Sequence, residues 1–142
     1  MGYGTVYKCQ MCSAPLNLIK ERSVCKCEYC GNWQTIPAMD DEKKINNYER
    51  ADRLLQNNEF DRASEVYGMI VANYPSEAVA YWGIVLCKYG IEYVEDTKTT
   101  ERIPTCHRAS YDSILDDDDY KKALSLADYE AKQVYEYQAG RI

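Results

Sequence analysis

Four of the seven cysteines stand in two pairs with two residues inside each pair: Cys9 with Cys12, and Cys27 with Cys30. Fourteen residues separate the two pairs. In a Cys-x-x-Cys turn both sulfurs can face one ion, and four thiolates at about 2.3 Å complete the tetrahedral coordination of Zn²⁺. No coordination position then remains open for water. The spacing therefore predicts one zinc ion with a structural rather than a catalytic role, bound by these four cysteines.

Other uses of these thiols have to be weighed against zinc. Cys25 can replace Cys27 as a ligand, but Cys25 and Cys30 would enclose a looser loop, so we expect Cys25 to be a bystander. A redox dithiol accounts for one such pair but not for two at ribbon spacing. Iron fits the same four sulfurs, and availability in the cytosol favours zinc. An odd number of cysteines argues against a disulfide framework and for a reducing compartment.

The other reactive residue types show no catalytic arrangement. Cys106 and His107 are adjacent, and adjacent side chains of an extended chain point to opposite sides, which argues against a nucleophile and base pair. Cys87 lies among apolar residues of a predicted helix and suits a core position. The run Asp116–Asp119 lacks the glycine and the final glutamate of an EF-hand loop and suits a helix N-terminus. We expect no enzymatic activity and no small-molecule substrate.

Residues 1–39 have to position the cysteines. The segment has short β-like runs and few apolar residues, and a chain of about 40 residues normally needs a metal or disulfides to fold. We therefore expect a rubredoxin-like zinc ribbon that ends at Pro37. Tyr29 and Trp33 are expected to pack beside the second cysteine pair rather than to stack on nucleic-acid bases.

Residues 40–142 have helical periodicity, and the 14 tyrosines of the chain offset its low content of other large apolar residues, so a tyrosine-rich core is expected. The predicted elements, in chain order, are a helix through Ile45–Leu55, a helix from Phe60 to about Asn73, a helix capped by Ser76 that ends before Gly90, a β-hairpin of Ile91–Val94 and Glu101–Pro104, a helical turn at Tyr111–Leu115, and one long final helix after Asp116–Asp119.

The charge of the chain is unevenly distributed. Residues 1–39 are formally +2 and residues 40–142 are −8. Four thiolates with one divalent ion would cancel the surplus of the ribbon, whereas nucleic-acid binding needs Lys and Arg to neutralise phosphates. The chain has no signal-peptide pattern and no run near the ~20 apolar residues of a membrane span. We expect a cytoplasmic protein that binds another protein or itself, and neither nucleic acid nor a membrane.

Part of the helical segment follows a repeat pattern. Ala63, Tyr67, Ile70 and Pro75 match the second helix and turn of a tetratricopeptide (TPR) repeat, with Phe60 at the preceding aromatic position. Any helical hairpin that ends at a proline is the alternative. The pattern predicts a pair of closely packed helices.

The ribbon, the repeat-like pair and the stretches YWGIVLCKYGIEYVED (81–96) and RIPTCHR (102–108) together resemble the N-terminal region of bacterial proteins with a C-terminal Toll/interleukin-1 receptor (TIR) domain. The resemblance covers nearly the whole chain and implies that it is the N-terminal part of a longer protein. TIR domains self-associate in signalling, and many bacterial ones cleave NAD in antiviral defence.

These observations give a mainly helical chain with two units, a zinc ribbon (1–39) and a TPR-like helical domain (40–142). We expect a non-enzymatic, zinc-stabilised interaction or sensor module that regulates a TIR domain outside this sequence. A nucleic-acid-binding zinc ribbon is the alternative function.

Overall fold

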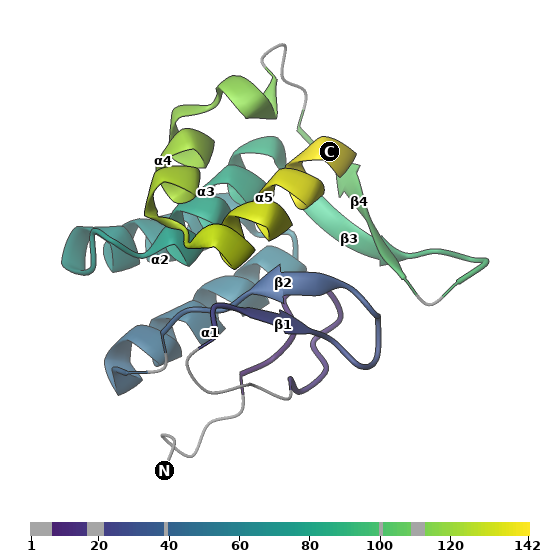
Figure 1. Ribbon diagram of the computed structural model, residues 1–142, viewed down its shortest axis with the longest axis horizontal. Coiled ribbons are helices and arrows are strands. Elements are labelled where there is room, and N and C mark those ends of the chain that lie inside the picture. Colours follow the sequence, from purple (N-terminus) through teal and green to yellow (C-terminus); the bar gives the residue numbers. More distant parts are fainter. Residues whose placement is uncertain (1–6, 17–21, 39, 100, 109–112) are drawn as a thin grey trace.

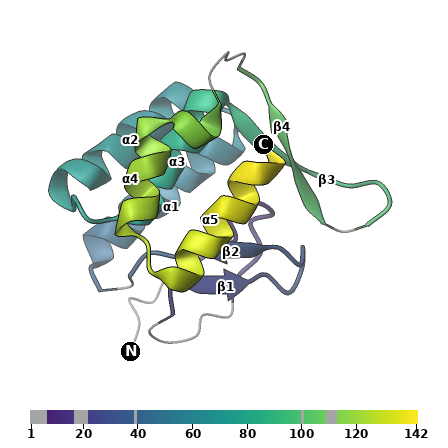
Figure 2. The same ribbon diagram turned by 45° about the horizontal axis from the view of Figure 1, so that its top comes forward.

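The computed structural model describes residues 7–16, 22–38, 40–99, 101–108 and 113–142, and Figures 1 and 2 show the arrangement of its helices and strands. A two-stranded ribbon lies on one side of a group of helices, and a second hairpin projects from that group. The last helix runs alongside the ribbon. The described residues are therefore mainly helical with two small antiparallel sheets, which confirms the fold class predicted from the sequence.

The ribbon is built from two strands of three residues each, β1 (Val24–Lys26) and β2 (Trp33–Thr35). They pair antiparallel, with Cys25 opposite Gln34. A separate bridge between Lys8 and Pro15 closes the first cysteine turn. Strands this short bury little surface, so the ribbon depends on what holds its turns and on what it packs against.

Three consecutive helices form the centre of the molecule: α1 (Glu42–Gln56), α2 (Phe60–Asn73) and α3 (Ala78–Tyr89). Asp41 caps α1, because its carboxylate accepts a hydrogen bond from Lys44 N at 3.1 Å. The cap of α3 is Glu77 and not Ser76, and its side chain makes no capping hydrogen bond. The prediction of Ser76 as the cap is therefore wrong, and the Glu77 carboxylate has other partners.

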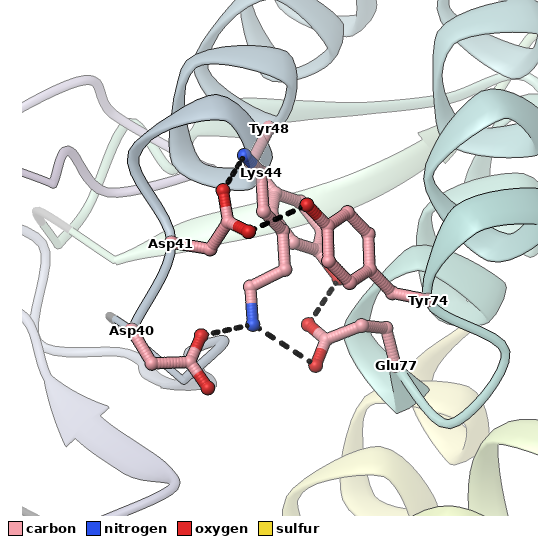
Figure 3. Close-up of polar contacts among 6 residues, drawn as sticks. All are labelled: Asp40, Asp41, Lys44, Tyr48, Tyr74 and Glu77. Carbon is pink, nitrogen blue, oxygen red and sulfur yellow. Dashed lines mark hydrogen bonds and ion pairs between the residues drawn. The ribbon is translucent and has the colours of Figure 1, made fainter.

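Those partners lie on the first two turns of α1, as Figure 3 shows. Lys44 Nζ is buried and lies 2.6 Å from Asp40 Oδ1 and 3.3 Å from Glu77 Oε2. Tyr48 donates its hydroxyl to Glu77 Oε1 at 2.8 Å, and Tyr74 donates to Asp41 Oδ2 at 2.7 Å. A buried ammonium group needs such partners, because an unpaired charge is costly away from water. The cluster joins the start of α1 to the turn between α2 and α3.

Gly83 allows α2 and α3 to approach closely. A Cβ atom at this position would lie 2.6 Å from the ring of Tyr67, which is fully buried. The small residue on α3 thus lets the aromatic residue on α2 pack directly against it.

The second hairpin follows α3 directly. Gly90 ends the helix in the left-handed conformation, with φ of 61°, which glycine adopts without strain. Strands β3 (Ile91–Glu95) and β4 (Arg102–Cys106) then pair antiparallel, as predicted. Asn32 donates its side-chain amide to Arg102 O at 3.0 Å, which links this hairpin to the second cysteine turn.

The segment after the hairpin corrects one prediction. A 3₁₀ helix, η1 (Ile114–Asp116), is followed by two helices, α4 (Asp118–Leu126) and α5 (Tyr129–Arg141), instead of one long helix. Ala127 is extended, and Asp128 starts α5 by accepting a hydrogen bond from Ala131 N at 2.9 Å. The break turns α5 away from α4 and onto the ribbon (Figure 2). The predicted helical turn at Tyr111–Leu115 lies partly outside the described residues.

Buried residues of the ribbon and of the helices form one continuous apolar cluster. Its largest fully buried side chains are Trp82, Tyr48, Tyr67 and Tyr135, so the predicted tyrosine-rich core is present. Tyr135 of α5 lies against Trp82 of α3, with ring centroids 5.3 Å apart. The division into units of 1–39 and 40–142 stays a prediction, because packing in one folded state does not tell whether the parts fold separately.

Candidate metal centre

The four paired cysteines converge on one point. All four sulfurs lie within 4.8 Å of one another, with Cys9 and Cys30 3.8 Å apart and Cys12 and Cys27 3.6 Å apart. Tetrahedral Zn–S bonds of about 2.3 Å place sulfurs about 3.8 Å from each other, whereas a disulfide places them about 2.0 Å apart. The clustering predicted from the spacing is confirmed, and its geometry fits one tetrahedral ion. That the four cysteines bind zinc stays a prediction.

The two turns that carry the cysteines share one backbone arrangement. Ser13 N donates to Cys9 O at 2.9 Å, and Gly31 N donates to Cys27 O at 2.9 Å. In both turns the N–H of the first cysteine bonds to the carbonyl five residues later, at 2.8 and 3.0 Å. Ser13 and Gly31 have φ of 67° and 76°, so in each turn the backbone reverses directly after the second cysteine. This reversal lets both sulfurs of a pair face the same point.

The cysteines of the cluster differ in how readily they ionise without a metal. Burial raises the pKa of Cys9 far above that of an ordinary thiol, and it raises the pKa of Cys30 to about 11. Burial also opposes ionisation of Cys27, but the N–H groups of its own turn outweigh it and leave its pKa below the ordinary value. Four thiolates this close repel one another, so a divalent cation is what would keep them all ionised.

Side chains of α1 and α2 hold the first cysteine turn. Gln56 of α1 donates its amide to Cys9 O at 3.1 Å and to Gln10 O at 2.9 Å. The Gln10 amide in turn donates to Asp52 Oδ1 at 3.3 Å and approaches Tyr67 Oη at 3.4 Å. The turn is therefore tied to both helices through polar side chains, which the spacing of residues in the sequence did not predict.

Asp52 is the centre of these polar contacts. Its carboxylate also accepts hydrogen bonds from Tyr7, at 3.1 Å, and from Tyr67. Burial raises the pKa of Asp52 to about 6, against the lowering effect of these hydrogen bonds. One signal was present in the sequence: Asp52 falls on the apolar stripe of α1, between Tyr48 and Leu55. A carboxylate on a buried helix face requires hydrogen-bond donors from elsewhere in the fold.

Cys12 is the member of the cluster closest to solvent, since it is half-buried while the other three are buried. A surface cavity of about 220 Å³ lies beside it, lined by residues that include Ser13, Gln56, Tyr93 and Arg102. Cys12 is therefore the sulfur through which a chelator or another reagent would reach the centre first.

Cys25 lies outside the cluster. It is buried in β1 opposite Gln34, which agrees with its predicted role as a bystander. Cys87 is buried in α3, as expected. Of the acidic run 116–119, Asp117 caps α4 by accepting hydrogen bonds from Asp119 N at 2.9 Å and Tyr120 N at 3.1 Å.

The neighbours Cys106 and His107 have separate surroundings. Cys106 pairs with Ile91 across the β3–β4 ladder, and its side chain is exposed. The ring of His107 lies 2.7 Å from Glu92 Oε1 and 6.0 Å from the centroid of the Phe60 ring. The histidine is thus engaged by the hairpin and by α2.

The two aromatic residues near the second cysteine pair differ in their surroundings. Tyr29 is 65% exposed and Trp33 is 46% exposed. Tyr29 lies inside the tight turn between Cys27 and Cys30. Tyr29 is therefore open to solvent, whereas the less exposed Trp33 lines a surface pocket together with Val24 and Val134.

No helix among the described residues is long and apolar enough to cross a membrane. A comparison of the chain with protein-family models, with curated proteins and with solved structures found no match in any of the three.

Proposed function

We propose that Cys9, Cys12, Cys27 and Cys30 bind one zinc ion with a structural role. The observation that carries this proposal is the closed group of four sulfurs, with separations of 3.6 and 3.8 Å across the two turns. Four thiolates fill the tetrahedral shell and leave no position for water or substrate. The ion would contribute apparent binding energy on the order of 10 kcal/mol to a segment whose strands are very short.

Elemental analysis of the purified chain tests the metal. One zinc per chain is expected, and the same measurement identifies iron if iron is bound instead. Cys9→Ser or Cys30→Ser should lose the metal and unfold the ribbon. Cys25→Ser is the matched control, because Cys25 is as buried as Cys9, Cys27 and Cys30 but lies outside the cluster; it should retain the metal. A metal-free wild-type chain would end the proposal, and metal loss in Cys25→Ser would change the ligand set.

The wider role that we propose is a non-enzymatic interaction or sensor module, the N-terminal regulatory part of a bacterial TIR-domain protein. Its support is the sequence resemblance together with the closely packed pair α2 and α3 at Tyr67 and Gly83. Reading the coding sequence past Ile142 tests the link to a TIR domain. The chain alone is expected to leave NAD intact, and light scattering with zinc present measures whether it self-associates.

One observation favours the alternative, a nucleic-acid-binding ribbon. Tyr29, Trp33 and Lys26 are exposed on the ribbon, and bases stack on exposed aromatic rings. The acidic helical part opposes such binding. A filter-binding assay with single-stranded DNA and RNA at low salt decides between the two. Retention that falls with salt and is lost in Tyr29→Ala would favour the alternative, whereas we expect no retention.

A further inference from the structure

Gln34 places a side-chain amide against the metal centre. It lies in the middle of β2 and is only 2% exposed. Its Oε1 accepts a hydrogen bond from Gln10 N at 3.0 Å, and its Nε2 lies 2.9 Å from Cys9 Sγ. One buried side chain therefore bridges the first cysteine turn and the strand that follows the second.

The orientation of this amide follows from its partners. A backbone N–H can only donate, so the oxygen of Gln34 has to face Gln10 N. The NH₂ group is then directed at the sulfur of Cys9 and acts as a donor. A thiolate accepts such a bond far better than a neutral thiol does, because hydrogen bonds to charged acceptors are stronger. The arrangement suits Cys9 in its ionised, metal-binding form.

Three hydrogen-bond donors surround the sulfur of Cys9. This sulfur is fully buried and also lies 3.4 Å from Met11 N and 3.5 Å from Cys12 N. Gln34 makes the shortest of these three contacts and is the only side chain among them. The backbone donors come with the turn itself, whereas the Gln34 donor depends on this particular residue.

We infer that Gln34 is a positioning residue for the metal: it fixes the Cys9 sulfur and balances its negative charge through a side-chain hydrogen bond. This inference rests on the proposed binding of zinc by the four cysteines. Partners that hydrogen-bond a metal ligand orient it, and their loss typically weakens metal affinity 10–100-fold. Gln34 thereby makes the affinity of the site depend on β2 as well as on the two cysteine turns.

The test compares the 142-residue wild-type chain with Gln34→Met, in which a side chain of similar shape lacks the donor. Zinc affinity is measured by competition with a chromophoric chelator, and about 10–100-fold weaker binding is expected. The cobalt-substituted protein gives a second measurement. Loss of a hydrogen bond raises the energy of the sulfur electrons, so the thiolate-to-cobalt charge-transfer bands should move to longer wavelength.

Gln138→Met is the matched control. Gln138 is also a buried glutamine that supports β2, since it donates to Trp33 O at 2.8 Å, but its bonding partner is a backbone carbonyl and not a sulfur. It should lower thermal stability and leave the cobalt bands in place. Gln34→Glu provides a second variant, because it keeps an oxygen for Gln10 N and replaces the donor with a negative charge; it should weaken zinc binding more than Gln34→Met.

The outcomes separate the two proposals. If the wild-type chain binds neither zinc nor cobalt, the metal centre itself is refuted, and the role of Gln34 with it. If the wild type binds metal but both Gln34 variants keep its affinity within twofold and its cobalt bands, only the positioning role is refuted. An equal band shift in Gln138→Met would also refute it, because the effect would then come from general loosening of the ribbon.

Discussion

Chelation of the metal is expected to unfold the ribbon and to release α5, while α1 to α4 stay folded. The reason is the packing of α5, which lies on β1 and β2. Its Gln138 donates to Trp33 O at 2.8 Å, and Asp128 accepts a hydrogen bond from Ser23 Oγ at 2.8 Å. A helix of this length is marginal in water without such packing.

The size of the effect follows from the helix lengths. α5 has 13 residues, and the other helices have 15, 14, 12 and 9. Loss of α5 alone therefore removes about a fifth of the helical signal. The first three helices retain a core of their own around Tyr48, Tyr67 and Trp82, all of them fully buried.

Circular dichroism at 222 nm, before and after addition of a zinc chelator, measures this loss. Hydrogen exchange locates it: protection should disappear from Val24–Thr35 and Tyr129–Arg141 and persist in α1 to α3. Addition of zinc should restore both signals. Collapse of the whole helical signal would show that ribbon and helices form one cooperative unit, and an unchanged signal would show that α5 needs only the helices. Either result refutes the reasoning.

Three further substitutions have defined expectations. Gly83→Ala should destabilise the fold by about 1–3 kcal/mol in thermal unfolding, because its Cβ would lie 2.6 Å from the buried Tyr67 ring. Gly68→Ala in α2 has open space around the added Cβ and should be neutral or stabilising in the same assay. Burial raises the pKa of Asp52 to about 6, above the ~3.9 of an unfolded Asp. The stability that the protonated Asp52 contributes is therefore complete below about pH 4 and is lost as pH rises through 6. In urea unfolding, Asp52→Asn should therefore gain about 1 kcal/mol relative to wild type between pH 5 and pH 7, and a constant difference would contradict this. Lys44→Met should lower the free energy of unfolding by about 1–3 kcal/mol in urea, because it leaves the largely buried Glu77 without its cation. Arg62→Met breaks an exposed pair with Glu59 and should change stability by less than about 1 kcal/mol. Equal losses in the two variants would contradict the importance of burial.

Features set by local spacing were predictable from the sequence. The two Cys-x-x-Cys turns determine where their sulfurs point through bonds within each turn, such as Ser13 N to Cys9 O. The helix end at Gly90 depends in the same way on neighbouring residues. These features required no knowledge of distant parts of the chain.

Features that depend on distant contacts were missed. The apolar periodicity continues from Leu124 through Ala131 and predicts one unbroken helix. The only sign in the sequence of the helix break at Ala127 is the residue after it, Asp128, which can cap a new helix. The roles of Gln34 and Gln56 arise from contacts with residues 25 and 47 positions away. A glutamine in a short strand or on a helix is ordinary in sequence, and only its position in the fold gives it a polar partner at the metal centre.

The cap at Asp128 also sets the order in which the molecule can be completed during synthesis. By directing α5 onto the ribbon, it joins parts of the chain that are made far apart in time: Gln138 and Trp33 are 105 residues apart, as are Asp128 and Ser23. At roughly 5–20 residues per second, the ribbon emerges about 5 to 20 s before the helix that covers it. During that interval a metal ion, if bound, and the contacts of α1 and α2 with the first cysteine turn would hold the ribbon together, so metal uptake by the nascent chain would come before closure of the fold.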